Sequence, residues 1–145
     1  MNVRRAEPRD FGAVTALLEE LGRAKVTAGT RVEAHAVFLA QLDEPGAGPL
    51  VVEDGGELIA CCSFHFRPRL NRATPDAWIP DLIVTASARR RGAGRALLEE
   101  AERLARERGC WALTLESGYQ RHDAHLLYEA FGMENEGYYF GKALS

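Results

Sequence analysis

The stretch ASARRRGAGRALLEE, residues 86–100, constrains the fold of this chain more than any other. Glycine inside a helix costs about 1 kcal/mol relative to alanine, and neighbouring arginines repel one another. Both features fit a turn that precedes a helix, because apolar residues after Gly94 recur at helical spacing. The stretch therefore predicts a strand, a short basic turn and a helix from Gly92 to Arg108, ended by Gly109.

A basic, glycine-rich turn at the start of a helix is suited to binding an anion. The first backbone N–H groups of a helix lack internal partners, and glycine lets a phosphate approach the backbone closely. Arg91 to Arg95 are therefore candidates to hold a pyrophosphate. No lysine follows the glycines as in a P-loop, and the third glycine of the dinucleotide fingerprint is missing. The alternative is a turn that only connects a strand to a helix.

The remaining periodicities predict a single domain, residues 1–145, of the α+β or mixed α/β class around one mixed sheet. Expected strands are Asn2–Ala6, Leu50–Glu53, Glu57–Phe66, Trp78–Val84, Cys110–Glu116 and Tyr138–Leu144, and expected helices are Pro8–Leu21, Arg31–Leu42, Gly92–Arg108 and His122–Phe131. The order is β-α-α-β-β-β-α-β-α-β. Residues 67–76 read as a loop or hairpin tip, and Pro80 predicts a sheet edge or bulge.

The charge, the apolar runs and the cysteine spacing of the chain argue against several classes of function. The net charge of -3 argues against a nucleic-acid-binding domain that would use the arginine clusters, which we keep as an alternative. The apolar runs are too short for a membrane span and the first residues lack a signal-peptide core, so we expect a cytoplasmic protein with no membrane partner. The cysteines have no CxxC spacing that would indicate zinc. We interpret Cys61 and Cys62 as buried apolar residues, with a catalytic cysteine as the alternative.

Two motifs resemble signatures of a known family. Arg89, Gly92 and Gly94 form RxxGxG after a strand that ends in DLIV, which resembles the coenzyme A signature of the GNAT N-acetyltransferases. The segment AHLLYEAFGM, residues 124–133, is similar to the family's AxxxYxxxGF segment. The element order agrees from Asn2 to Leu144. The resemblance implies the GNAT fold with a partly splayed sheet, and acetyl-CoA as co-substrate without a metal.

The resemblance assigns residues to the donor site. The pyrophosphate of acetyl-CoA is expected at Arg89, Arg91, Gly92, Ala93, Gly94 and Arg95. Backbone groups of Leu82 and Val84 are expected to bind the pantetheine arm, and an N–H near Leu82 or Ile83 the acetyl oxygen. The alternative, a plain core strand, is compatible with this role because side chains can be buried while the backbone binds.

Acetyl transfer to an amine requires a neutral amine, stabilisation of a tetrahedral intermediate and a proton for the departing thiolate. Tyr128 lies at the family position of the general acid that contacts coenzyme A; the alternative is a packing aromatic. Asp81 is the candidate base, and Glu116 is the second candidate. His122 and His125 are further options. Pro80 stands where relatives often carry an acidic residue, so the chain departs from the family pattern there.

The expected acceptor is a small-molecule amine. The segment SGYQRHDAHLLYEAFGM resembles a subgroup with aminoalkylphosphonate and aminoglycoside acetyltransferases. His65, Arg67, Arg69 and His122 are candidates to line the acceptor site, together with Arg72. If these arginines point into it, the substrate is anionic; the alternative is a solvated basic loop beside a buried histidine.

Other classes stay open at this point. A non-catalytic acyl-CoA-binding or regulatory module has the same fold, and a protein N-terminal or lysine acetyltransferase has the same chemistry. Because family members are often dimers, the resemblance also implies a homodimer.

Overall fold

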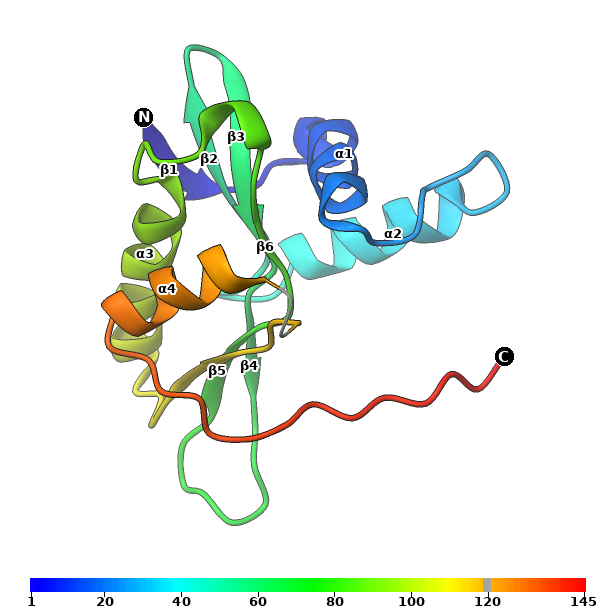
Figure 1. The fold of residues 1–145 in the computed structure, drawn as a ribbon. Coiled ribbons are helices and arrows are strands. Elements are labelled where there is room, and N and C mark those ends of the chain that lie inside the picture. Colours follow the sequence, from blue (N-terminus) through cyan, green and yellow to red (C-terminus); the bar gives the residue numbers. More distant parts are fainter. Residues whose placement is uncertain (119–120) are drawn as a thin grey trace. The chain divides into compact units, whose positions relative to one another are not determined.

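The computed structural model describes residues 1–118 and 121–145, and it divides into two compact units, residues 1–115 and 116–145 (Figure 1). The first unit contains, in chain order, β1 (Asn2–Arg5), a 3-10 turn (Pro8–Asp10), α1 (Phe11–Leu21), α2 (Arg31–Leu42), β2 (Leu50–Asp54), β3 (Glu57–Cys62), β4 (His65–Arg67), β5 (Asp76–Ile79), β6 (Leu82–Val84), a 3-10 turn (Ala86–Ala88), α3 (Ala93–Arg108) and β7 (Leu113–Leu115). The second contains α4 (His122–Ala130). The predicted α+β class is confirmed.

The strands of the first unit form two sheets rather than the single sheet we expected. One has the order β1-β2-β3-β6 and is antiparallel, and the other has the order β4-β5-β7, with β7 parallel to β5. The long strands expected at 57–66 and 78–84 are each interrupted, the second at Pro80. Because proline has no N–H to donate, the ladder of β5 does not continue into β6. Thus β5 pairs with β7 while β6 pairs with β3, which is the predicted splay.

Helices cover both faces of the four-stranded sheet, with α1 and α2 on one side and α3 on the other (Figure 1). Val51, Cys61 and Ile83 lie opposite one another on neighbouring strands and pack against α1 and α2. Successive strand residues face opposite sides, so Ala60 and Leu82 face the other way. Buried residues on the helices include Phe11, Val14 and Leu17 of α1, Phe38 of α2, and Leu97, Leu98 and Ala101 of α3.

Helix α3 is bracketed by two glycines in the left-handed region. Gly92 precedes it with φ +86°, and Gly109 follows it with φ +80°. Other residues adopt this region at a cost of roughly 1–2 kcal/mol. The sequence placed this helix correctly to within one residue, because glycine marks both of its ends.

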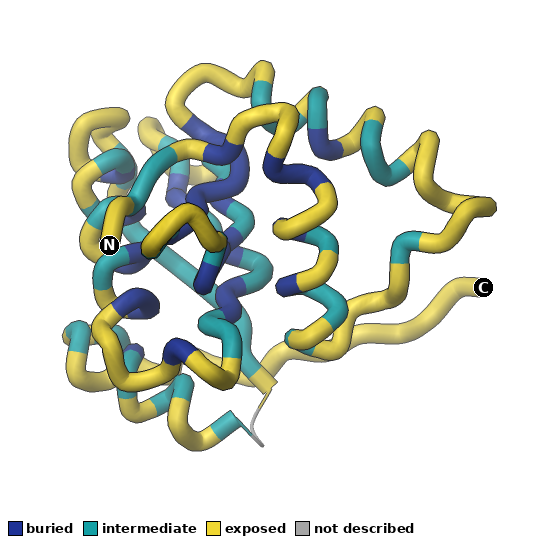
Figure 2. The backbone as a smooth tube through the Cα atoms, turned by 90° about the horizontal axis from the view of Figure 1, so that it is seen from above, coloured by how far each residue is buried: buried dark blue, intermediate teal, exposed yellow. Residues whose placement is uncertain are grey.

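The C-terminal segment, residues 134–145, contains no helix or strand, which corrects the prediction of a strand at Tyr138–Leu144. Tyr138 and Phe140 are each 87% exposed, and the whole segment is exposed (Figure 2). Alternation of apolar residues suggested a strand, but a strand gains its hydrogen bonds only from a neighbouring strand. None pairs with this segment within the described part of the chain.

Candidate functional site

The turn between β6 and α3 brings an exposed glycine, Gly92, to the start of the helix. The first helical hydrogen bond runs from the Ala96 N–H to the Gly92 carbonyl (3.0 Å), so the N–H groups of Ala93 and Gly94 precede the helical ladder. Gly92 has no side chain to cap the helix, and a Cβ there would meet nothing within 4 Å. Ala93 and Gly94 are buried, which fixes the helix start against the sheet. The backbone of the turn can therefore receive an anion.

The arginines of this turn are exposed. Arg91 lies 3.4 Å from Asp54 through Nη1, and Arg95 lies 3.1 Å from Glu99 one helical turn on. Arg89 and Arg90 form no ion pair within residues 1–118 and 121–145. Exposed pairs of this kind contribute about 0–1 kcal/mol, so these side chains are held weakly. The turn combines a fixed backbone with adjustable positive charge.

Glu20, near the end of α1, fixes the beginning of the turn. Its carboxylate accepts hydrogen bonds from the Thr85 hydroxyl (2.8 Å) and from the Ala86 N–H (2.8 Å). The partners are 65 and 66 residues apart in sequence, so no local pattern could have indicated this contact. Glu20 thereby connects α1 to the segment that leads into the candidate anion site.

Strand β6 directs alternate backbone groups away from β3, the strand with which it pairs in the described structure. The Thr85 N–H donates to the Ile59 carbonyl (2.8 Å), and the Ser63 N–H donates to the Asp81 carbonyl (3.0 Å). Alternate residues of an antiparallel strand face the partner, so the backbone of Ile83 faces β3. The N–H and C=O groups of Leu82 and Val84 therefore point away from β3. Because β6 is an edge strand in the described structure, these groups pair with no other strand there.

Asp81 lies at the interruption between β5 and β6, and its carboxylate is already engaged. Arg23, which follows α1, donates to it from Nε (2.5 Å), and the Ser63 hydroxyl donates to it at 3.2 Å. The Asp81 N–H in turn donates to Ser63 Oγ (3.0 Å). Arg23 was not predicted from the sequence, since 58 residues separate it from Asp81. The predicted base is thus held in place by two side chains.

The cysteines of β3 lie beside this interruption but do not suit nucleophilic chemistry. Cys61 and Cys62 are buried, as the sequence interpretation expected. Burial, aided by the negative charge of Asp81, raises the pKa of the Cys61 thiol to about 12. Burial also raises the pKa of the Cys62 thiol. Both thiols are protonated at neutral pH and lack the thiolate that a nucleophile needs.

The hairpin of β4 and β5 contains an ion pair to a buried carboxylate, at the two ends of the segment expected to be a loop or hairpin tip. Asp76 is the first residue of β5 and is 1% exposed. It accepts hydrogen bonds from Arg67 through Nη2 (2.8 Å) and Nε (3.2 Å) and from the Thr114 hydroxyl (3.3 Å). Arg69 approaches the same carboxylate at 3.7 Å. Burial alone would raise the pKa of Asp76, but the hydrogen bonds and charges of its partners leave that pKa below its ordinary value.

Aromatic rings hold the basic side chains of this hairpin. The guanidinium of Arg67 lies 4.5 Å from the centre of the Trp78 ring, and that of Arg72 lies 3.8 Å from the Trp111 ring. His65 is half-buried, with its Nδ1 3.9 Å from Glu44 and its ring beside Trp78. Of the predicted acceptor residues, Arg67 and Arg69 are therefore brought together, and His65 lies next to them on β4.

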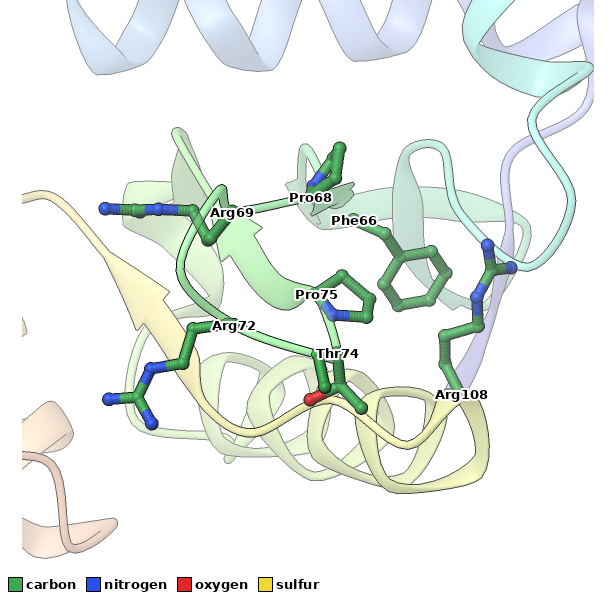
Figure 3. Close-up of a pocket in the computed structure, with 8 residues that line it drawn as sticks. Phe66, Pro68, Arg69, Arg72, Thr74, Pro75 and Arg108 are labelled. Carbon is green, nitrogen blue, oxygen red and sulfur yellow. The ribbon is translucent and has the colours of Figure 1, made fainter.

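A cavity of about 280 Å³ opens at the tip of the hairpin. Phe66, Pro68 and Pro75 provide its apolar lining, and Arg69, Arg72 and Arg108 provide the charged part (Figure 3). Arg69 and Arg72 extend to the same side of the loop, whereas Arg108 lies on the other side with Phe66 (Figure 3). The Arg108 guanidinium is 4.9 Å from the Phe66 ring.

The second unit contains the remaining predicted residues. Tyr128 is the buried residue of α4, and its carbonyl accepts from the Met133 N–H (2.9 Å), which closes the helix. His122 is exposed, and its ring lies 6.0 Å from that of His125. The Nε2 atom of His125 hydrogen-bonds the Gly118 carbonyl (2.9 Å). Glu116 begins this unit and is half-buried.

In the part of the chain that the structure describes, none of the helices is both long and apolar enough to cross a membrane. No three His, Cys, Asp or Glu side chains in residues 1–118 and 121–145 are grouped to hold a metal ion.

Comparisons with known proteins agree on one family. Residues 14–133 match the family model described as "Acetyltransferase (GNAT) family". Over 142 residues the chain is 29% identical to the aminoalkylphosphonate N-acetyltransferase of Salmonella typhimurium (strain LT2), covering 98% of this chain and 90% of that protein. A 66-residue stretch is 44% identical to the uncharacterized N-acetyltransferase YhdJ of Bacillus subtilis (strain 168), covering 45% of this chain and 46% of that protein.

Solved structures share the fold. A putative acetyltransferase from Agrobacterium tumefaciens superimposes with a TM-score of 0.84 at 28% identity, covering 99% of both chains. An aminoglycoside N-acetyltransferase solved in complex with CoA superimposes with a TM-score of 0.78 at 14% identity, also covering 99% of both chains.

Proposed function

Because the chain is an acyltransferase of the acetyltransferase (GNAT) family, we propose that it moves an acetyl group from acetyl-CoA to the primary amine of a small molecule. The family uses acetyl-CoA. One observation carries the proposal: an edge strand with outward backbone groups is followed, after residues 85–92, by the start of α3 at an exposed glycine. A ligand with an amide-rich arm and a pyrophosphate end matches these two features in that order.

The turn before α3 would bind the pyrophosphate. Its backbone supplies N–H groups at the positive end of the helix dipole, at Gly92, Ala93 and Gly94. Arg89, Arg91 and Arg95 would add charge-assisted hydrogen bonds. Their exposure supports this role, because weakly held arginines reorient at little cost.

Strand β6 would bind the pantetheine arm and position the thioester. The arm carries amide groups that can pair with the outward groups of Leu82 and Val84, as an added strand would. Of the two N–H groups predicted for the acetyl oxygen, that of Leu82 points to the open edge and that of Ile83 faces β3. The Leu82 N–H is therefore our choice for polarising the carbonyl and stabilising the tetrahedral intermediate.

Proton transfer would use one group that gives a proton and one that accepts a proton. The amine attacks as a free base, the C–S bond of the tetrahedral intermediate breaks, and the departing thiolate takes a proton. We assign that proton to the Tyr128 hydroxyl, which the AHLLYEAFGM segment supports. Asp81 or Glu116 would accept the amine proton, directly or through water. Asp81 is supported by its place at the interruption beside Leu82.

The test measures binding and turnover separately. Saturating acetyl-CoA is expected to raise the unfolding temperature, since a ligand at 1,000 times its Kd adds about 4 kcal/mol. Small amines are expected to release free thiol from acetyl-CoA. Tyr128→Phe should lower kcat at least about tenfold, while Tyr139→Phe, an exposed tyrosine of the C-terminal segment, should leave it unchanged. Stabilisation without amine-dependent release from any acceptor would instead support a non-catalytic module.

The homodimer and the cytoplasmic location stay predictions of the sequence analysis. Light scattering across a concentration series would test the first, and fractionation of cells would test the second. Neither is needed for the chemistry proposed above.

A further inference from the structure

We propose that the β4–β5 hairpin binds an anionic group of the acceptor, so that the substrates are elongated primary amines with a phosphate or carboxylate at the far end. The residues concerned are Arg67, Arg69 and Arg72, called here the hairpin arginine cluster. This inference rests on the proposed function, since it names the class of amine that the transferase accepts. It adds a binding role for residues that lie away from the donor site.

The cluster has more positive charge than its surroundings balance. Asp76 is the one carboxylate that pairs with Arg67 or Arg69 within the described residues, and no carboxylate pairs with Arg72 there. Two guanidinium groups thus share one buried carboxylate, and the third, that of Arg72, has no carboxylate partner there, in a chain whose net charge is -3. Like charges held together repel, and a bound anion relieves that repulsion. The charge of the cluster therefore favours an anionic ligand over a neutral or cationic one.

The geometry of the cluster leaves its donors free to bind. Arg72 stacks on Trp111, which occupies the flat face of the guanidinium and leaves the N–H groups in its plane. Those in-plane donors are the ones that bind phosphate or carboxylate in a forked arrangement. Arg69 and Arg72 extend to the same side of the loop (Figure 3). The cavity of about 280 Å³ beside them is large enough for a phosphate or carboxylate group.

The position of the cluster sets the length of the substrate. Strand β5 begins at Asp76 and ends at Ile79, so the interruption at Pro80 lies four residues after Asp76, roughly 13 Å along an extended chain. Trp78 lies between them on the same face as Asp76, because strand residues two apart share a face. A substrate that places its amine at Asp81 and its anion at the cluster would lie across Trp78.

Two peptide probes of equal length test the acceptor role. Extended tetraglycine separates its amine from its carboxylate by roughly 13 Å, and tetraglycinamide lacks the negative charge. The wild type should use tetraglycine with a kcat/KM about tenfold higher. Arg69→Gln and Arg72→Gln should bring the ratio close to one. Arg106→Gln, an exposed arginine of α3 that pairs with Glu102, serves as the control and should keep the wild-type ratio.

A substitution that only damages the fold would lower kcat/KM for both peptides equally. The ratio of the two kcat/KM values therefore separates loss of anion binding from general loss of activity. Equal use of both peptides by the wild type, or an unchanged ratio in both arginine variants, would overturn the proposal. Failure of the proposed function looks different: acetyl-CoA then neither stabilises the protein nor loses its acetyl group to either peptide.

A second measurement tests the site without turnover. With CoA saturating the turn before α3, inorganic phosphate should still stabilise the wild type against heat, and the increase should be at least halved in Arg69→Gln and Arg72→Gln. The same increase in these variants and the wild type would mean that phosphate binds elsewhere, and the cluster would lose its role. Arg72→Lys keeps the charge but not the flat fork, so an intermediate shift is expected.

Discussion

The turn before α3 and the β4–β5 hairpin are both rich in arginine, yet the two regions are built in different ways. In the turn, the fixed part is the backbone: Gly92 and the first residues of α3 set the positions of N–H groups, and the arginines are exposed. In the hairpin, the fixed part is made of side chains, with Arg67 held by a buried carboxylate and by the Trp78 ring. Residue type alone does not reveal which arginines are organised.

The difference matters for energy as well as for binding. An exposed ion pair such as Arg91 with Asp54 contributes about 0–1 kcal/mol. In the hairpin only the carboxylate of the pair is buried, and removing it takes away the acceptor of hydrogen bonds from Arg67 and Thr114. The hairpin should therefore be sensitive to loss of its carboxylate, whereas the turn should be sensitive to changes in its backbone.

The largest effect is expected from Asp76→Asn. Arg67, whose side chain is 33% exposed, would lose its charged partner, and hydrogen bonds would be lost at a position that is 1% exposed, so the free energy of unfolding should fall by about 1–3 kcal/mol. Asp54→Asn is the matched control, because Asp54 pairs with an arginine of the turn but is 38% exposed. It should lower the unfolding free energy by less than about 1 kcal/mol. Urea unfolding of both variants checks this, and equal losses would remove the energetic distinction between the regions.

Acid should lower the stability of the protein by protonating Asp76 and a second buried carboxylate, Asp10, which accepts a hydrogen bond from Arg4 (2.7 Å). The hydrogen bond from Arg4 lowers the pKa of Asp10, and the partners of Asp76 lower its pKa despite burial. A lowered pKa in the folded state means stability that is present above the unfolded value near 4 and lost as the pH falls through the folded value. Each group then contributes a slope of up to about 1.4 kcal/mol per pH unit.

The unfolding free energy should accordingly fall below about pH 4, through Asp10 and Asp76. A pH series of urea titrations measures the slope. Asp76→Asn should make the acid-side slope shallower, because one of the two groups no longer titrates. If the slope is the same in this variant, Asp76 does not carry the linkage assigned to it.

The backbone of the turn can be tested with two equivalent glycines. Gly92 and Gly109 flank the same helix at φ +86° and +80°, and a Cβ at either position would meet nothing within 4 Å. Replacement of either by alanine should cost roughly 1–2 kcal/mol of stability through backbone strain. Only Gly92→Ala should also weaken acetyl-CoA binding, by about tenfold, because it shifts the helix start that would hold the pyrophosphate. Calorimetric titration with acetyl-CoA separates the two; equal binding losses would argue against a pyrophosphate at this turn.

The same contrast explains what the sequence revealed. The turn was found because its signal is local: glycines, arginines and a helical repeat fall within fifteen residues of one another. Helix α2 was predicted at its observed bounds for the same reason, and the interruption at Pro80 follows from a missing N–H.

The features that the sequence did not reveal depend on contacts across long separations. Arg67 and Thr114, which both hold Asp76, are 47 residues apart, and Asp76 itself resembled the end of a polar loop. The residues 138–144 have the alternation of a strand, but alternation does not supply a neighbour to pair with. A pattern along the chain thus predicts an element more reliably than it predicts the partners of that element.

The smallest effect concerns how the turn is joined to the rest of the molecule. Glu19 and Glu20 are neighbours near the end of α1, and each accepts a backbone hydrogen bond, Glu19 from Val26 (3.3 Å) and Glu20 from Ala86 (2.8 Å). Removing an exposed hydrogen bond of this kind costs about 1 kcal/mol or less, so Glu20→Ala should raise the KM for acetyl-CoA by about threefold with little change in kcat. Glu19→Ala releases a different segment and should leave that KM unchanged. A change in kcat alone for Glu20→Ala would mean that α1 influences the reacting groups rather than the pyrophosphate. An equal rise of the KM for acetyl-CoA in both variants would mean that the turn depends on the whole end of α1. The backbone of the turn would then not be fixed by Gly92 and the first residues of α3 alone, as the contrast with the hairpin assumes.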